Sequence, residues 1–265
     1  MRRSVLAVRD LWKNFTELLG LLTIIPVSSE HRLELNSLYL ISLVGLIKGL
    51  LVSSSLPLIY FFSGEYLFML VALVIAIHYI IQGFLHADGF IDFSEAIIAS
   101  RSGADPYKVM KDVHKGSFAI VVFAVYMLIL YSTLVTLFTI KSLPSIFLII
   151  VSSETFSLIS SLFLSYIGNE PPEGMGRIFK KNLRERDLVI SILISSAAIL
   201  ILSTTLGVAI AKIIILLITS LLSLTMSTAL TYFLSKRILG FVSGDVLGFC
   251  IELTYLLILS TGVLF

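Results

Sequence analysis

The chain carries little charge and has almost no cysteine. Only 14% of its 265 residues are Asp, Glu, Lys or Arg, whereas an ordinary soluble domain carries about 25%. Because 57% of the residues are hydrophobic, the polar surface is too small to cover a globule in water, which excludes a soluble enzyme and a disordered chain. The single cysteine, Cys250, excludes a disulfide framework and a CxxC metal site. The net charge of +2 gives no sign of nucleic-acid binding.

Long apolar runs dominate what is present. A membrane-spanning helix needs about 20 mostly apolar residues. Seven runs of suitable length follow one another, separated by turn-forming or charged residues: 37–62, 66–86, 117–140, 144–167, 188–206, 208–234 and 246–264. We therefore predict an all-α, polytopic membrane bundle of about seven transmembrane helices, which forms a single domain over 1–265.

The N-terminal segment differs from these runs. Basic residues between Arg2 and Lys13 are interleaved with Leu, Trp and Phe. This pattern is typical of an amphipathic helix that lies on a membrane surface, and we expect such a helix within 1–34. No small-residue cleavage site follows the apolar stretch, which argues against a signal peptide.

The distribution of positive charge predicts an orientation. If the N-terminus is cytoplasmic, the segments 1–36, 87–116, 168–187 and 235–245 lie inside and hold 16 of the 19 Lys and Arg residues. Cytoplasmic loops of membrane proteins are enriched in these residues. We therefore expect a multi-pass protein of the cell membrane, embedded in the lipid bilayer, with nearly all of its polar sequence on the cytoplasmic side.

Three carboxylates follow the second run at helical spacing. Asp88, Asp92 and Glu95 are separated by four and three residues, so a helix places them on one face. Like charges repel there, and a divalent cation would remove the repulsion. Mg²⁺ suits the pattern, because it binds one or two carboxylates and completes its coordination with water and substrate phosphates. The alternative is a solvated helix face at the end of a span.

Cations and possible proton acceptors lie close to these acids. Arg101, Lys108 and Lys111 are candidates to hold phosphate groups, although the topology alone would also place cations there. A general base for a hydroxyl nucleophile would be His, Asp or Glu. The candidate catalytic residues are His86, Asp112 and His114.

Two further polar loops are candidates for substrate contacts. The loop that contains Pro171, Pro172, Glu173, Gly174 and Gly176 has a bent backbone, and it is either a cover for the substrate or a simple connector. The loop before the last run offers Ser243, Gly244 and Asp245, where helix capping explains the aspartate nearly as well as catalysis does.

Four ionisable residues fall inside the apolar runs, where such residues are functional hypotheses by default. Lys48 either reaches toward the membrane surface or pairs with Glu154, and His78 is expected to be a hydrogen-bonded interior residue. Glu252 lies within two turns of the cytoplasmic end and is placed to face the site.

Several short motifs give the chain a recognisable signature. It resembles the cobalamin synthase family, the adenosylcobinamide-GDP ribazoletransferases. The motifs that carry the resemblance are Gly83 to Asp92 (GFLHADGFID), Ala99-Ser100-Arg101, Val109 to Asp112 with Gly116, Thr23 to Val27, Glu173 to Gly176 (EGMG), and Ser243 to Gly248 (SGDVLG) with Glu252. They occur in order and span nearly the whole chain. The chain departs from the family pattern at Glu95 and Ala96, where the family has Asp-Gly, at Ile24 or Ile25 for an Arg, and at Glu154, also for an Arg.

The resemblance implies a function. A member of this family joins adenosylcobinamide-GDP to α-ribazole or α-ribazole 5′-phosphate and releases GMP. For this chain it implies a magnesium site at Asp88, Asp92 and Glu95 and substrate contacts from the loops described above. Oligomeric state is left open, and a homo-oligomer is compatible with the sequence.

Other membrane proteins provide alternatives. A CDP-alcohol phosphotransferase would need Ala-Arg where Asp92 and Phe93 stand. A UbiA-type prenyltransferase would need a second aspartate-rich motif, which is missing. A transporter would need polar or broken helices in mid-membrane, whereas most polar groups here lie in loops.

Overall fold

The computed structural model describes residues 2–27, 36–60 and 66–265, and all regular structure within these ranges is helical. The predicted interfacial helix is present as α1 (Arg2–Leu22). Its C-terminal half packs on the bundle through the buried side chains of Leu18, Leu19 and Leu22, whereas Trp12 is 66% exposed. The helix is therefore amphipathic, as predicted. The end of the expected 1–34 segment, from residue 28, lies outside the described residues.

Most of the predicted spans are single helices. Within residues 2–27, 36–60 and 66–265, six helical segments are long and apolar enough to cross a membrane, so the protein is a multi-pass helical membrane protein. The segments are Leu38–Leu58, which contains η1 (Leu38–Leu40), α2 (Ile41–Ser53) and part of η2 (Leu56–Tyr60), then α6 (Ser117–Ile140), α7 (Leu143–Ile167), α9 (Glu185–Thr205), α10 (Ile210–Ile238), and α11 (Gly244–Thr261) with η4 (Gly262–Leu264).

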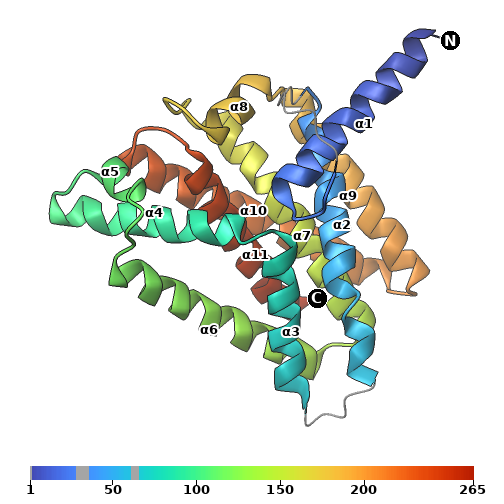
Figure 1. Ribbon diagram of the computed structural model, residues 1–265. Helices are drawn as coiled ribbons and strands as arrows, with labels where there is room; N and C mark the ends of the chain where they lie inside the picture. Colours follow the sequence, from blue (N-terminus) through green and yellow to red (C-terminus); the bar gives the residue numbers. More distant parts are fainter. Residues whose placement is uncertain (1, 28–35, 61–65) are drawn as a thin grey trace.

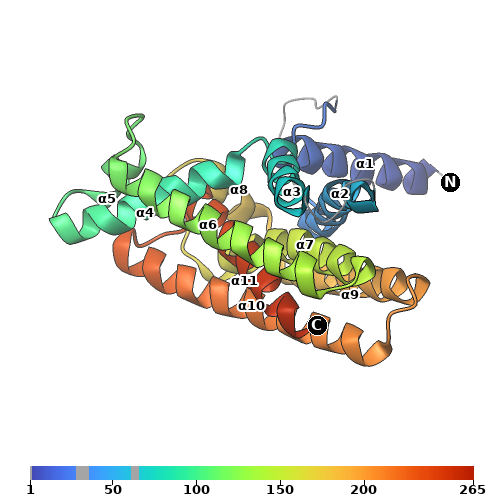
Figure 2. The same ribbon diagram turned by 90° about the horizontal axis from the view of Figure 1, so that it is seen from below.

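Helix α7 is the centre of the bundle. It packs against α2, α9, α10 and α11, and Figure 2 shows it between α2 on one side and α10 on the other. Its contact with α2 is close because Gly45 and Gly49 present no side chain. A Cβ atom at either glycine would stand 2.7 Å from the Cα of Thr155 or Val151. Small residues four apart allow such close approach of membrane helices.

The second predicted run is broken. It contains α3 (Leu67–Ile81) and only the start of α4 (Leu85–Ser102), and the two helices meet at 89°. Gly83 and Phe84 between them adopt φ values of 60° and 59°, a left-handed conformation that cannot continue an α-helix. As a result α4 lies across the bundle instead of prolonging α3 (Figure 1).

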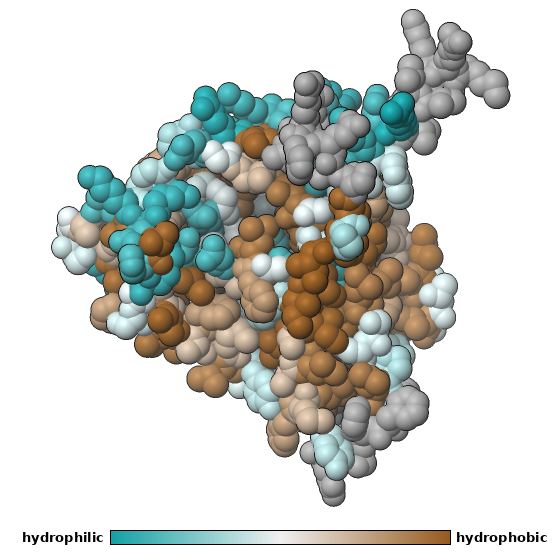
Figure 3. All heavy atoms as spheres, in the orientation of Figure 1, coloured by the Kyte–Doolittle hydropathy of each residue, from teal (hydrophilic) through white to brown (hydrophobic). Residues whose placement is uncertain are grey.

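Polar residues gather at one end of the molecule. This polar end contains α4, α5 (Pro106–Met110), α8 (Met175–Asn182) and the start of α11. Hydrophilic residues cover it in Figure 3, whereas the flanks of the bundle are hydrophobic. The broken span thus brings the acidic helix α4 to the end where the polar loops meet.

Candidate active site

The site is built on a close contact between α4 and α11. A Cβ atom on Gly89 would stand 2.9 Å from the carbonyl oxygen of Asp245, and one on Gly248 would stand 3.2 Å from the Cα of Gly89. Any larger side chain would force the two backbones apart. The two glycines therefore bring the carboxylate-bearing turn of α4 against the N-terminus of α11.

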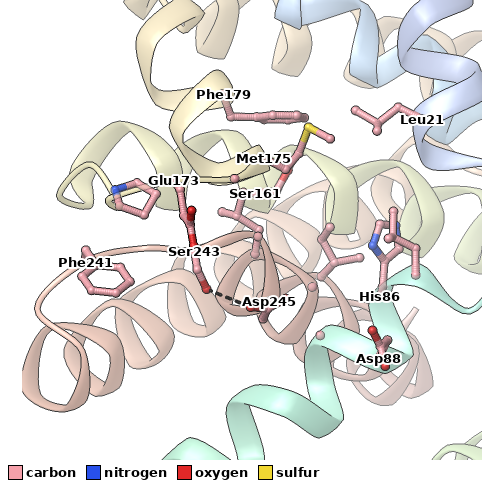
Figure 4. Close-up of a pocket in the computed structure, with 18 of the residues that line it drawn as sticks. Leu21, His86, Asp88, Ser161, Glu173, Met175, Phe179, Phe241, Ser243 and Asp245 are labelled. Carbon is pink, nitrogen blue, oxygen red and sulfur yellow. Dashed lines mark hydrogen bonds between the residues drawn. The ribbon is translucent and has the colours of Figure 1, made fainter. Parts of the chain in front are cut away.

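A cavity of about 200 Å³ opens above this contact. Its wall is contributed by the end of α1, the first turns of α4 and α11, α5, α7, α8 and the loops before α8 and α11. Figure 4 shows His86 and Asp88 on one side of this pocket and Phe179, Met175 and Leu21 on another. The pocket therefore has a charged part and an apolar part.

Lysines pair with the carboxylates in the charged part. The Lys111 Nζ lies 3.1 Å from the Asp245 Oδ2, and the Lys115 Nζ lies 2.7 Å from the Asp92 Oδ1. Asp88 and Asp245 are also close enough to Asp92 to repel its charge. Burial acts to lower the pKa of Lys111, but Asp245 outweighs it and holds this pKa above its usual value. The site thus alternates positive and negative groups.

Local sequence explains the position of α5. Asp105 caps this short helix by accepting hydrogen bonds from the backbone N–H groups of Tyr107 and Lys108, and Pro106 occupies the first turn. The Tyr107 hydroxyl then donates to the Glu173 Oε1 at 3.2 Å. This bond joins α5 to the loop before α8, so two polar loops meet over the pocket.

The proline-rich loop is held in its bent form. Arg177 donates to the Glu170 carboxylate at 2.6 Å, which lowers the pKa of that glutamate. The Val242 N–H donates to the Asn169 carbonyl oxygen at 3.1 Å, and a Cβ on Gly176 would meet the Val242 carbonyl oxygen at 2.7 Å. The loop therefore packs on the loop before α11 and forms part of the pocket wall, and it is more than a connector.

The sequence matches a known protein family over most of its length. The family model for cobalamin-5-phosphate synthase matches residues 14–263. The chain belongs to this family. It is 31% identical over 171 residues to the adenosylcobinamide-GDP ribazoletransferase of Saccharolobus solfataricus, a match that covers 63% of this chain and 66% of the relative. The enzyme of the same name from Clostridium perfringens strain SM101 is 26% identical over 74% of this chain and 78% of its own length. No solved structure gives a significant match.

Eight of the fifteen predicted site residues line the pocket. His86 in the first turn of α4 is 3% exposed, and its Nε2 has no hydrogen-bond partner within the described part of the chain. Gly176 stands just behind the wall. The other predicted residues that line the pocket are Asp88, Lys111, Glu173, Gly174, Ser243, Gly244 and Asp245.

Seven predicted residues do not line the pocket: Asp92, Glu95, Gly176, Arg101, Lys108, Asp112 and His114. Arg101 is exposed near the end of α4, and the Lys108 side chain is 83% exposed beside Asp105. His114 is 93% exposed in its side chain, and its Nδ1 lies 3.3 Å from the Asp112 Oδ1. The backbone N–H of His114 lowers the pKa of Asp112. Of the three candidate catalytic residues, His86 lines the cavity, whereas Asp112 and His114 do not.

The three predicted metal ligands differ in their surroundings. Asp88 faces the pocket, Asp92 pairs with Lys115, and the Glu95 Oε1 accepts a hydrogen bond from the Gly116 N–H. The Glu95 Oε2 is buried without a partner in the described ranges. Within those ranges, no three His, Cys, Asp or Glu side chains are grouped as metal ligands.

Sequence reasoning missed several residues of this site. In the sequence, Lys115 is one of several cations of the same loop. The spacing between Asp92 and Lys115 does not reveal that the chain folds back and pairs the two side chains. Tyr107, Met175 and Phe179 were missed because apolar and aromatic residues are common throughout the chain. Met175 and Phe179 could have been found, because they follow the proline-rich loop on the short helix α8, which has one apolar face.

Proposed function

We propose that this chain transfers the phosphocobinamide part of adenosylcobinamide-GDP to a ribazole acceptor and releases GMP. The observation that carries the proposal is the family match over residues 14–263, which includes every residue that lines the pocket. The relatives carry the name of this reaction. Acidic and basic groups side by side at the end of a membrane bundle suit a diphosphate substrate.

The bonds that change define what the site must do. A ribose hydroxyl of the acceptor attacks the phosphorus that carries the cobinamide side chain. A new P–O bond forms, and the bond from this phosphorus to the oxygen of the GMP phosphate breaks. Lys111 and Lys115 stand where they can bind phosphate oxygens and absorb the negative charge of the leaving group. The acceptor is α-ribazole or its 5′-phosphate, and the attacking hydroxyl belongs to the ribose in both cases.

His86 is our choice for the proton acceptor. Its ring is buried in the pocket wall, and its Nε2 is free of hydrogen bonds to the described residues. A neutral imidazole nitrogen of this kind takes the hydroxyl proton as the new P–O bond forms. Asp112 and His114 are less suited because they point to solvent.

The donor set fits Mg²⁺, although the ligand group differs from the one predicted. Asp88 on α4 and Asp245 on α11 line the pocket and offer the oxygen ligands that Mg²⁺ prefers. Asp92 lies close enough for both charges to act on it, but no three acidic side chains of the described residues are grouped as ligands. Glu95, with one unpartnered oxygen, is available beside them. We propose that these residues hold the ion and displace the lysines onto phosphate. When bound, Mg²⁺ would neutralise diphosphate oxygens.

The polar end is proposed to face the cytoplasm. The loops that form the pocket belong to the segments that hold most of the Lys and Arg residues. Soluble nucleotides would then reach the site directly, while the hydrophobic flanks remain in the bilayer.

The apolar part of the pocket is proposed to bind the flat base of the ribazole acceptor. Met175 and Phe179 on α8 face Leu21 on α1 in Figure 4, and aromatic and thioether groups pack well on ring faces. We expect Phe179→Ala to raise the KM for the acceptor about tenfold, which corresponds to roughly 1.4 kcal/mol of lost packing. The KM for adenosylcobinamide-GDP should stay within about twofold. Steady-state kinetics with each substrate varied in turn measure both constants.

A matched control uses an aromatic residue outside the pocket. Phe233 on α10 is 60% exposed on the flank of the bundle, so Phe233→Ala should leave both constants unchanged. Equal increases of both KM values in Phe179→Ala would contradict the assignment of this side to the acceptor.

The experiment for the function itself is direct. Detergent-purified protein is incubated with adenosylcobinamide-GDP, α-ribazole or α-ribazole 5′-phosphate, and Mg²⁺, and products are followed by mass spectrometry. GMP and the joined corrinoid should appear together, and comparison of the two acceptors shows which is preferred. Protein that is folded but forms no joined product would sink the proposal and favour another diphosphate-substrate transferase.

A further inference from the structure

Charged side chains form a cluster deep in the bundle, where the proposed chemistry does not use them. Lys48 on α2, His78 on α3, Glu154 on α7 and Glu252 on α11 are each at most 2% exposed. None of them lines the pocket. The Lys48 Nζ lies 3.2 Å from one oxygen of Glu154, and the His78 Nδ1 lies 2.5 Å from the other.

Glu252 extends the cluster to α3 and α6. Its Oε2 accepts hydrogen bonds from the hydroxyls of Tyr79 at 3.0 Å and Tyr126 at 2.7 Å. Its Oε1 accepts from the Gln82 Nε2 at 3.1 Å and lies 3.9 Å from the His78 Nε2. The cluster therefore joins α2, α3, α6, α7 and α11 through hydrogen bonds and ion pairs.

Charge balance explains why the bundle tolerates these groups. Two buried carboxylates beside one lysine would leave a net negative charge in an apolar medium, which is costly. A positive charge on His78, between Glu154 and Glu252, makes the cluster neutral, and an imidazolium has an N–H for each of the two carboxylates. Removing one member therefore leaves an uncompensated charge or an unsatisfied donor.

The position of the cluster indicates its role. His78, Tyr79 and Gln82 occupy the last turn of α3 and its end, directly before the left-handed residues Gly83 and Phe84. The next helix, α4, carries the residues of the charged part of the pocket. Contacts that hold the last turn of α3 in place therefore also determine the direction of α4 after the break.

The N-terminal segment holds the same break from the other side. The Ile24 N–H donates to the Ile81 carbonyl oxygen at 2.8 Å, and a Cβ on Gly83 would stand 2.9 Å from the Ile24 side chain. The break is thus fixed by backbone contact on one side and by the charged cluster on the other.

We propose that the buried cluster of Lys48, His78, Glu154 and Glu252 is a positioning device that sets the bend between α3 and α4. It acts through Tyr79 and Gln82, and it thereby holds His86 and Asp88 at the pocket. The expected change in kcat rests on the proposed function, whereas the expected change in helix position does not. The change in helix position can be tested without substrate.

The test separates positioning from general stability. Glu252→Leu removes the acceptor for both Tyr79 and Gln82, and spin labels at Ser100→Cys on α4 and Arg186→Cys on α9, both exposed, report the distance across the polar end. Cys250→Ser removes the native thiol. We expect Glu252→Leu to broaden and shift this distance distribution by several ångströms, and to lower kcat about a hundredfold with KM values changed less than threefold.

A matched control lies on the same helix. Thr254 is fully buried two residues from Glu252 and makes a 2.5 Å hydrogen bond to Ser227 on α10, so Thr254→Val removes a buried polar contact away from the break. This control should lower the melting temperature in detergent without changing the label distance or kcat. If it changes them as much as Glu252→Leu does, the cluster contributes stability only and the proposal is wrong.

The conservative variant keeps the test decisive if Glu252→Leu fails to fold. Glu252→Gln retains an acceptor oxygen for the tyrosines but loses the charge, so it should shift the label distance and kcat in the same direction by a smaller amount. Unchanged distance and kcat in this folded variant overturn the proposal. If the wild-type protein forms no joined product while the label distance still responds to Glu252, the proposed function fails and the positioning inference stands.

Discussion

Replacing Asp88 or Asp92 by asparagine is expected to lower kcat by about a hundredfold to a thousandfold, the usual loss when a group that stabilises developing charge is removed. Both carboxylates belong to one helix turn beside Lys111 and Lys115. Asparagine keeps the shape of the side chain but loses the charge that pairs with a lysine or binds a cation. Rates of GMP release by purified variants measure the effect.

Two controls distinguish a loss of catalysis from a loss of folded protein. The amount of each variant in the membrane should equal that of the wild-type protein, because Asp88 faces the pocket and Asp92 is only near it, so neither is part of the apolar core. Glu185→Gln, which changes an exposed carboxylate at the start of α9, should leave the rate within about twofold. Near-normal rates in either aspartate variant would remove these residues from the site.

The helical spans were predictable because length and composition alone determine them. A run of 25 residues without charge other than Glu154 has to form a buried membrane helix such as α7. The amphipathic α1 was predictable for a similar reason, since its periodicity shows on which side it packs. In both cases the signal is local in the sequence.

The break between α3 and α4 was not predictable from the same reasoning. The sequence from 66 to 86 is mostly apolar apart from His78, Gln82 and His86, and Gly83 alone is no sufficient signal because glycine is common in membrane helices. The left-handed conformation of Phe84 depends on contacts from distant segments, namely Ile24 and the cluster around Glu252. Tertiary contacts decide such a conformation, and local propensity does not reveal it.

Pairings between segments were predictable only in part. The proposed pair of Lys48 and Glu154 is confirmed at 3.2 Å, and His78 is a hydrogen-bonded interior residue, as expected. Two opposite charges in an apolar medium have few other options. Glu252, expected to face the site, instead binds Tyr79 and Tyr126 away from the pocket, because helical periodicity alone does not specify which neighbour a side chain meets.

Removal of divalent cations is expected to abolish the transferase activity. Asp88 and Asp245 line the pocket and repel the charge of Asp92, and lysines pair with Asp92 and Asp245. A diphosphate substrate brings further negative charge to the same place, so lysines alone cannot balance both the carboxylates and the phosphates. We therefore expect no GMP release in excess EDTA and full recovery when Mg²⁺ is added beyond the chelator.

Lys115→Met provides the decisive comparison for this requirement. The variant frees Asp92 from its ion pair, so less Mg²⁺ should be needed for half-maximal activity, while kcat falls about tenfold because a phosphate contact is lost. Arg186→Met, which removes an exposed cation on α9, should change neither value. Titration of the initial rate with Mg²⁺ measures both quantities. Full activity of the wild-type protein in excess EDTA would show that these carboxylates serve the reaction without a metal, with Lys115 as the partner of Asp92 and Lys111 as the partner of Asp245.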